Sequence, residues 1–296
     1  MKKIFFIAAI ITVVSCQLSV VRGQQYARYF ERPFAHLGVT VGGGLGSMMY
    51  ENENGKTMPG LNLDLGVHYT HFLSSIGLGL GVHLTSVGSS ATYNHEEVSR
   101  NLTHANNPGA HYDLTTRYAD WREKEKIMVL GIPVELFYRA QVGHGSQFIG
   151  GLGVEVDIPV RGRYSSGGGS YTTTGLFPVG GPHPVSEMPE HGFSTYEETF
   201  GAQITDLKLG FSVVADAGLR LALGYSGGVY IGIYGGMGLS SILGEGERKE
   251  TMLTINAEDA SQIDYYGTFA ANGNPALRLL RIGVKVGIDL GAPMDN

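Results

Sequence analysis

The chain has 296 residues, of which 43% are hydrophobic and only 16% are Asp, Glu, Lys or Arg, whereas soluble domains carry about 25% charged residues. The 45 glycines are about twice the ordinary usage and follow no triplet repeat, which excludes a collagen-like chain. The formal net charge of −6 argues against a nucleic-acid partner, because such a partner requires a basic face.

The N-terminus has the features of an export signal. Two lysines precede the apolar run Ile4–Val14, which is too short to span a bilayer. Cleavage after Gly23 would make residues 1–23 the signal peptide, and lipidation at Cys16 is the alternative. We favour cleavage at Gly23, because a membrane-spanning protein gains little from an acyl anchor. Residues 24–33 then form a short lead-in, which we expect in the periplasm.

Eight later segments alternate apolar residues with glycine, polar or charged residues. They are residues 36–50, 60–72, 76–85, 124–139, 148–161, 207–223, 229–240 and 276–290. A period of two places the two sets on opposite faces of a strand. The sixth segment keeps this pattern from Leu207 to Leu223, longer than the about 9–11 residues that a tilted transmembrane strand needs. The apolar faces carry no charge, so we predict that they face lipid.

The connections between these segments alternate between short and long. The short ones lie near residues 72–75, 140–146 and 224–228, and the long ones are 86–122, 162–203 and 244–274. This alternation is typical of transmembrane barrels with short periplasmic turns and long external loops. An even number of strands closes the sheet without a free edge, which lipid would not tolerate.

This layout resembles the small eight-stranded outer-membrane barrels of the OmpA/OmpX type. The resemblance covers residues 34–290, leaves 291–296 as a C-terminal tail, and rests on the pattern of strands and connections. It implies an all-β, antiparallel, up-and-down transmembrane β-barrel in the outer membrane. No peptidoglycan-binding domain follows the barrel, and Leu290 is not followed by the terminal aromatic that often closes such barrels.

The inward face of the predicted barrel carries six acidic and six basic residues. The acids are Asp64, Glu135, Glu155, Asp157, Asp216 and Asp289, and the bases are Arg139, Arg161, Lys208, Arg220, Arg281 and Lys285. An eight-stranded barrel is only wide enough for side chains to fill it, and an unpaired buried ion costs several kcal/mol. We therefore predict a salt-bridge network that plugs the lumen, with a narrow ion path as the alternative. We expect His36, His68 and His83 to be hydrogen-bonded lumen residues rather than metal ligands.

The long connections are the predicted functional surface. Their histidines and acids show no metal-ligand spacing, so we predict neither metal nor cofactor. Alternation over 113–118 suggests strands that continue beyond the membrane and could pair with a partner's strand edge. We predict a non-enzymatic protein, without catalytic residues, that contacts outer-membrane lipid and presents these loops for binding, adhesion or envelope integrity. A lipid-modifying barrel enzyme is the alternative, although it would need a Ser or His nucleophile beside an apolar slot.

Overall fold

A computed structural model gives the architecture of most of the chain. It describes residues 34–50, 55–104, 107–143, 146–178, 183–204, 206–223, 227–244, 251–255, 263–268 and 276–293. The predicted signal peptide and the lead-in, residues 1–33, lie outside the described residues. Within the described ranges, no helix has the length and apolar character required to cross a bilayer.

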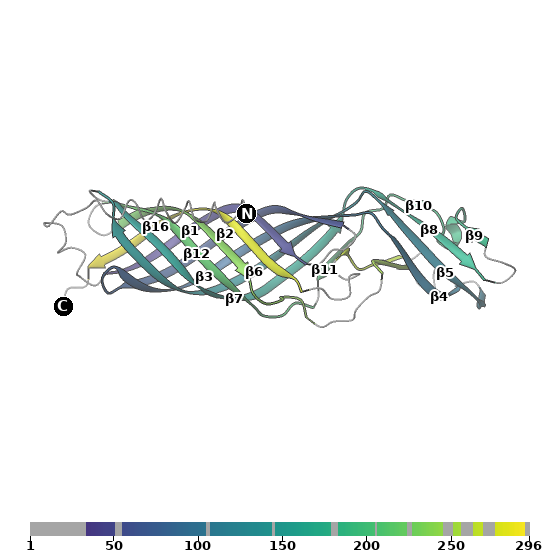
Figure 1. Ribbon diagram of the computed structural model, residues 1–296, viewed down its shortest axis with the longest axis horizontal. Helices are drawn as coiled ribbons and strands as arrows, with labels where there is room; N and C mark the ends of the chain where they lie inside the picture. Colours follow the sequence, from purple (N-terminus) through teal and green to yellow (C-terminus); the bar gives the residue numbers. More distant parts are fainter. Residues whose placement is uncertain are drawn as a thin grey trace, which may run out of the picture.

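Eight antiparallel strands form a closed ring (Figure 1). They are β1 (Phe34–Met49), β2 (Gly55–Phe72), β3 (Ile76–Tyr93), β6 (Trp121–Gln141), β7 (Ser146–Ser166), β12 (Gly210–Leu223), β13 (Gly227–Gly238) and β16 (Arg278–Pro293). The order around the ring is β7-β12-β13-β16-β1-β2-β3-β6, and β6 pairs with β7 to close it. The predicted eight-stranded, all-β ring is confirmed. Strand β16 continues to Pro293 and so extends into the predicted tail.

The ring strands expose their apolar side chains and bury their polar ones. On β1, Val41 is 61% exposed whereas Thr40 is 2% exposed, and on β16 Ile288 is 63% exposed. The other ring strands, which we call staves, likewise expose their apolar side chains. A belt of exposed Leu, Val and Ile therefore surrounds the ring. A soluble protein rarely exposes an apolar patch of this extent. The ring is therefore a transmembrane barrel whose outer face is dissolved in lipid.

Three staves continue well beyond the lipid-facing belt on the side of the long connections. Strands β3, β6 and β7 carry a second sheet at the far end of the molecule (Figure 1). It contains β4 (Glu96–His104), β5 (Asn107–Ala119), β8 (Ser170–Phe177) and β10 (Thr195–Tyr196), and β9 (His183–Val185) pairs with β8. A short 3-10 helix, η1 (Pro189–His191), precedes β10. We call this sheet the platform. Two of the predicted long loops, 86–122 and 162–203, thus contain the strands of the platform.

An aromatic core fills the space between the barrel and the platform. Trp121, Tyr93 and Tyr171 are each no more than 1% exposed and belong to one buried cluster. The connection between β13 and β16 packs into it through the hairpin of β14 (Leu253–Ile255) and β15 (Ile263–Tyr265). Strand β11 (Gly201–Ile204) pairs with the upper part of β7. We call this region the cap: it comprises the buried cluster around Trp121, the β14–β15 hairpin and β11.

Candidate functional site

The lumen contains ten of the twelve charged residues predicted to face it. Strand alternation places them on the inner face, and their side chains are buried. These residues are Asp64, Glu135, Arg139, Glu155, Asp157, Asp216, Arg220, Arg281, Lys285 and Asp289. Inward glycines provide the space for them. A Cβ atom on Gly131 would lie 2.5 Å from Cδ of Glu155, so any larger residue there would displace this carboxylate from its position.

The three inward-facing charged residues of β16 form ion pairs at successive heights in the lumen. Lys285 Nζ pairs with Asp216, and Arg220 Nε donates a hydrogen bond of 2.5 Å to Asp289 Oδ2. Arg281 donates to the carboxylate of Glu155 and lies 3.4 Å from Asp157 Oδ1. Side chains of this length spanning the interior leave little open space, as expected for a barrel of eight strands.

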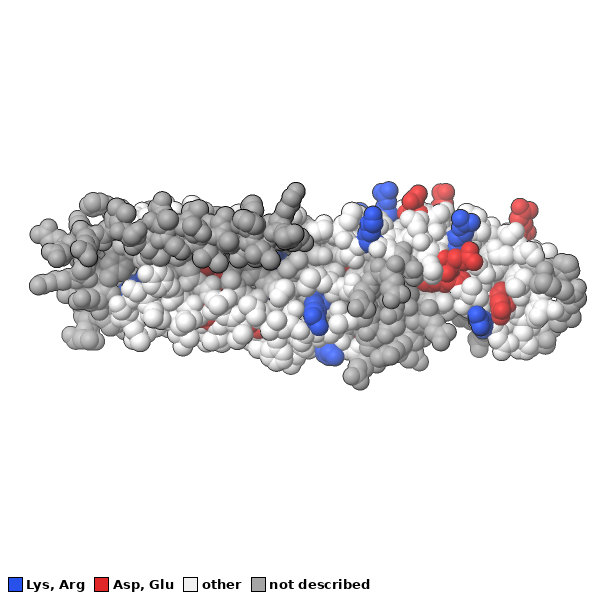
Figure 2. Space-filling view, in the orientation of Figure 1, with Lys and Arg blue, Asp and Glu red and all other residues white. Residues whose placement is uncertain are grey.

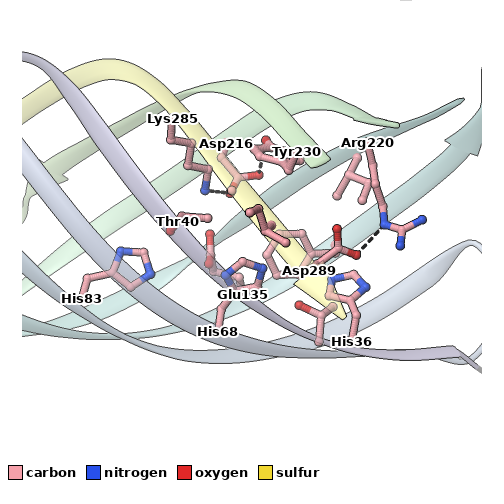
Figure 3. Close-up of a pocket in the computed structure, with 15 residues that line it drawn as sticks. His36, Thr40, His68, His83, Glu135, Asp216, Arg220, Tyr230, Lys285 and Asp289 are labelled. Atoms are coloured by element: carbon pink, nitrogen blue, oxygen red, sulfur yellow. Dashed lines mark hydrogen bonds and ion pairs between the residues drawn. The ribbon is translucent and has the colours of Figure 1, made fainter. Parts of the chain in front are cut away.

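Two remaining cavities of about 30 Å³ each lie between these pairs. Glu135 lines both of them, and no hydrogen bond or ion pair is found for it among the described residues. His36, His68 and His83 point into the first cavity (Figure 3). Charged side chains contribute to the lining of each cavity, and each is large enough to hold water.

The predicted lumen position of Arg161 is wrong. The register of β6 and β7 shifts, so that Met128 pairs with Arg161 whereas Val129 pairs with Pro159. This bulge adds one residue to β7, and a slip of one residue exchanges the faces of a strand. Arg161 is consequently exposed on the outer wall.

Lys208 is also outside the lumen, contrary to the prediction. The stave that was predicted to begin at Leu207 is interrupted, because β11 ends at Ile204 and β12 begins at Gly210. Lys208 lies in the interruption and is exposed. A pleat must be continuous for alternation to assign faces, and here it is not. The predicted balance of six acids and six bases therefore becomes six acids and four bases.

The lumen histidines do not gather with other ligands into a metal site. His83 Nδ1 lies 3.5 Å from Asp64 Oδ1, and Thr85 donates a hydrogen bond of 2.7 Å to the same carboxylate. The rings of His36 and His68 meet edge to face with centroids 6.0 Å apart. Among the described residues, no three His, Cys, Asp or Glu side chains are arranged to hold a metal ion.

The cap contains two buried carboxyl groups that the sequence reasoning missed. Glu123 is 0% exposed and Glu125 is 2% exposed. Glu123 accepts hydrogen bonds from the Tyr265 hydroxyl and from the backbone N–H of Thr268, 3.2 Å away. Glu125 accepts a 2.6 Å hydrogen bond from Tyr50. The alternating run from Arg122 to Lys126 was the available signal, because it places acids and bases on opposite faces of β6.

A third buried carboxylate joins the platform to the cap. Glu97 on β4 accepts hydrogen bonds from the hydroxyls of Tyr93, at 2.9 Å, and Tyr118, at 3.2 Å. It also accepts a 2.9 Å bond from the backbone N–H of Met252. One side chain therefore ties β3, β4, β5 and the β13–β16 connection together.

Burial perturbs the titration of all three cap carboxyls. Desolvation raises the pKa of Glu97 and of Glu123, although their hydrogen bonds oppose the rise. Desolvation and the neighbouring carboxyl of Glu123 raise the pKa of Glu125 to about 8. Oε2 of Glu125 has no hydrogen-bond partner among the described residues, which also disfavours the charged form.

The platform presents a groove beyond the membrane. It has a volume of about 250 Å³ and is lined by Asn101, His111, Tyr112, Asp113, Leu176 and Pro178. Asn101 adopts a left-handed conformation with φ of 55°, and its backbone N–H donates a 2.9 Å bond to Asp113. A small aromatic core of Tyr112, Leu114 and Phe193 supports the groove from behind.

Comparisons with known proteins give similarity to solved structures only. No protein-family model and no curated protein matches the chain. Among solved structures, it is similar to Neisserial surface protein A, with 7% identity, a TM-score of 0.33, and coverage of 87% of this chain and 96% of the other. It is also similar to OprG of Pseudomonas aeruginosa, with 12% identity, a TM-score of 0.33, and coverage of 89% and 97%.

A third similar structure is Ail, the attachment invasion locus protein of Yersinia pestis, solved with the heparin analogue sucrose octasulfate. It has 7% identity and a TM-score of 0.27, with coverage of 86% of this chain and 98% of the other. All three are small outer-membrane barrels, the class that the closed ring and the exposed apolar belt define for this chain.

Proposed function

We propose that this protein is a non-enzymatic outer-membrane barrel with a plugged lumen, which holds a folded platform away from the membrane to bind a surface partner. The observation that carries the proposal is the platform itself, a sheet with its own core and a groove of about 250 Å³. Strands β3, β6 and β7 extend past the membrane to support it. A protein that acted only within the membrane would not need a folded sheet held beyond it by three extended strands.

The filled lumen supports a binding role over transport. Its ion pairs cross the interior at three heights, and the cavities between them hold about 30 Å³ each. We expect no step currents when the full chain is inserted into planar bilayers. Defined conductance steps would favour the alternative of a narrow pore. Mass spectra of lipid A from cells with and without the protein should be identical, and a change in acylation would favour the lipid-modifying enzyme.

The binding role can be tested by removing the platform alone. Tyr93 and Trp121 are register partners on β3 and β6, so a two-residue turn can replace residues 94–120. Ser166 donates a backbone hydrogen bond to Phe200 O, so a second turn can replace 167–199. The resulting variant keeps all eight staves. We expect it to insert into the membrane but to lose adhesion.

The readout is the adhesion of cells that display the protein to arrays of immobilised glycans and extracellular-matrix proteins. The full chain should increase adhesion to at least one immobilised species, and the variant without the platform should not. A matched control, Arg161→Gln, changes an exposed residue on the barrel wall and should adhere like the unmodified chain. Equal adhesion with and without the platform would refute the proposal.

A further inference from the structure

Charged side chains on the eight ring strands are sorted by sign. All eight acidic residues of these strands face the interior, and none of them is exposed. By contrast, seven bases on the same strands are exposed on the outer wall. Where β6 leaves the membrane, Arg122, Lys124 and Lys126 point outward and the two glutamates between them point inward. The outer wall of the eight ring strands, as far as they are described, therefore carries positive charge and no exposed acid of its own.

The exposed bases gather at a single end of the barrel. Among the described Lys and Arg residues, four lie in the lumen and two, Arg100 and Arg117, lie on the platform. The remaining eight lie between the upper edge of the apolar belt and the base of the platform. They are Lys56, Arg122, Lys124, Lys126, Arg161, Arg163, Lys208 and Arg278, and we call them the basic rim. Figure 2 shows Lys and Arg appearing where the white barrel surface ends.

Strand pairing brings several of these bases close together. Lys126 pairs with Arg163 across β6 and β7, and Met128 pairs with Arg161 one step closer to the membrane. Directly paired residues on one face have Cβ atoms about 5 Å apart, and Arg161 and Arg163 are separated by about 7 Å along β7. Three positive charges thus lie within reach of a single phosphate-bearing headgroup. Without an anion they would repel one another.

The lowest members of the rim adjoin exposed apolar side chains. Val160, immediately before Arg161, is 61% exposed. Leu209, immediately after Lys208, is 58% exposed, and Leu280, two residues after Arg278, is 38% exposed. The wall therefore changes from apolar to basic within one or two residues on β7, on β16 and just before β12. A ligand that matches this boundary has hydrocarbon on one side and an anionic group on the other.

We infer that the basic rim binds the phosphate groups of an outer-leaflet membrane lipid, which rests on the membrane placement in the proposed function. Arg278 is on β16 and Lys126 is on β6, and these strands lie opposite each other in the ring. Lipid surrounds a barrel and can therefore reach both positions at once. Each base near an anionic lipid surface contributes about 1 kcal/mol, or about fivefold in affinity.

The test uses the full chain in detergent with two added lipids, lipid A bearing both phosphates and the same lipid after dephosphorylation. Native mass spectrometry gives the affinity for each. We expect the phosphorylated form to bind more than tenfold tighter, and binding to weaken as salt screens the charges. The variant Lys126→Gln/Arg161→Gln/Arg163→Gln should bind phosphorylated lipid about a hundredfold more weakly. The matched control, Arg100→Gln/Arg117→Gln on the platform, should bind like the unmodified chain.

All substituted side chains are exposed, and unchanged mobility on SDS gels without heating checks that each barrel is folded. The variant without the platform keeps the rim, so it should bind lipid A normally even if adhesion fails. Dextran sulfate, a soluble polyanion without acyl chains, tests whether the rim binds any anionic polymer rather than lipid. Equal binding of the two lipid forms, or normal lipid binding by the triple variant, overturns the inference. The inference would also be overturned if the triple variant lost binding to dextran sulfate but kept its binding to lipid A.

Discussion

Replacing Arg281 by methionine should destabilise the barrel by about 3–5 kcal/mol. Arg281 is 4% exposed and pairs with the carboxylates of Glu155 and Asp157, both no more than 2% exposed. Its Nη1 also donates a 3.3 Å hydrogen bond to Thr85. Methionine retains most of the side-chain length but leaves two neighbouring carboxylates without their cation. The measurement is urea-induced unfolding in phospholipid vesicles, followed by far-UV circular dichroism.

Two further variants separate the lost ion pair from a packing defect. Adding Glu155→Gln and Asp157→Asn to Arg281→Met removes the uncompensated charges, so stability should recover in large part. Arg161→Gln removes another arginine that the sequence pattern placed in the lumen but that is exposed, and it should change stability by less than about 1 kcal/mol. If Arg161→Gln and Arg281→Met had equal effects, the assignment of inner and outer faces would be wrong at this height.

The barrel could be predicted from sequence because lipid imposes one rule on every stave. An outward charge inside the apolar belt is costly, so the alternation along residues 276–290 or 60–72 identifies both the strand and its faces. The rule fails where the pleat is interrupted. A bulge moves Arg161 to the outer face, and the gap between β11 and β12 does the same for Lys208. Neither irregularity leaves a signal in hydrophobic periodicity.

The cap and the platform were harder to predict because water replaces lipid around them. Residues in this region can be buried from either side of a strand, so the strict outward-apolar pattern no longer holds. Only 113–118 kept enough alternation to predict strands beyond the membrane, and β5 includes this segment. The partners of Glu97 and Glu123 come from residues 155 and 145 positions away, Met252 and Thr268. Contacts of such separation cannot be read from local pattern.

The alternating charges of Arg122–Lys126 were a signal in the sequence for the cap and for the basic rim. This run spans the boundary between the predicted connection 86–122 and the predicted strand 124–139, and its charges of opposite sign occupy opposite faces of β6. The inward glutamates hold the cap, and the outward bases form part of the basic rim. Five consecutive residues therefore connect the interior of the extracellular region with its membrane-facing wall.

The cap should loosen as pH rises through about 8, and Glu125→Gln should remove most of that loosening. The pKa of Glu125 rises from 4.5 in the unfolded chain to about 8 in the cap. A carboxyl with a raised folded pKa contributes stability that is complete below pH 4.5. Each pH unit between the two values removes about 1.4 kcal/mol of it. Glutamine keeps the shape and the hydrogen bond to Tyr50 but cannot ionise.

The other groups that face Glu125 should not obscure this transition. Burial also raises the pKa of Glu123, so its ionisation destabilises the cap in the same direction. Burial and the neighbouring carboxyls raise the pKa values of Tyr50 and Tyr265, so these phenols stay protonated across the transition. Any change between pH 6 and 9 in this cluster therefore arises from the two carboxyls.

Trp121 provides the measurement, because it is the only tryptophan of the chain, is 0% exposed, and donates a 2.9 Å hydrogen bond to Tyr265 in the cap. Acrylamide should quench its fluorescence weakly at pH 6 and more strongly above pH 8. In Glu125→Gln the increase should be smaller, whereas Glu96→Gln, which alters an exposed acid on β4, should behave like the unmodified chain. Quenching that is independent of pH in the unmodified chain would mean that the cap tolerates an ionised Glu125. Its buried carboxyls would then fasten the β13–β16 connection to the barrel at every pH.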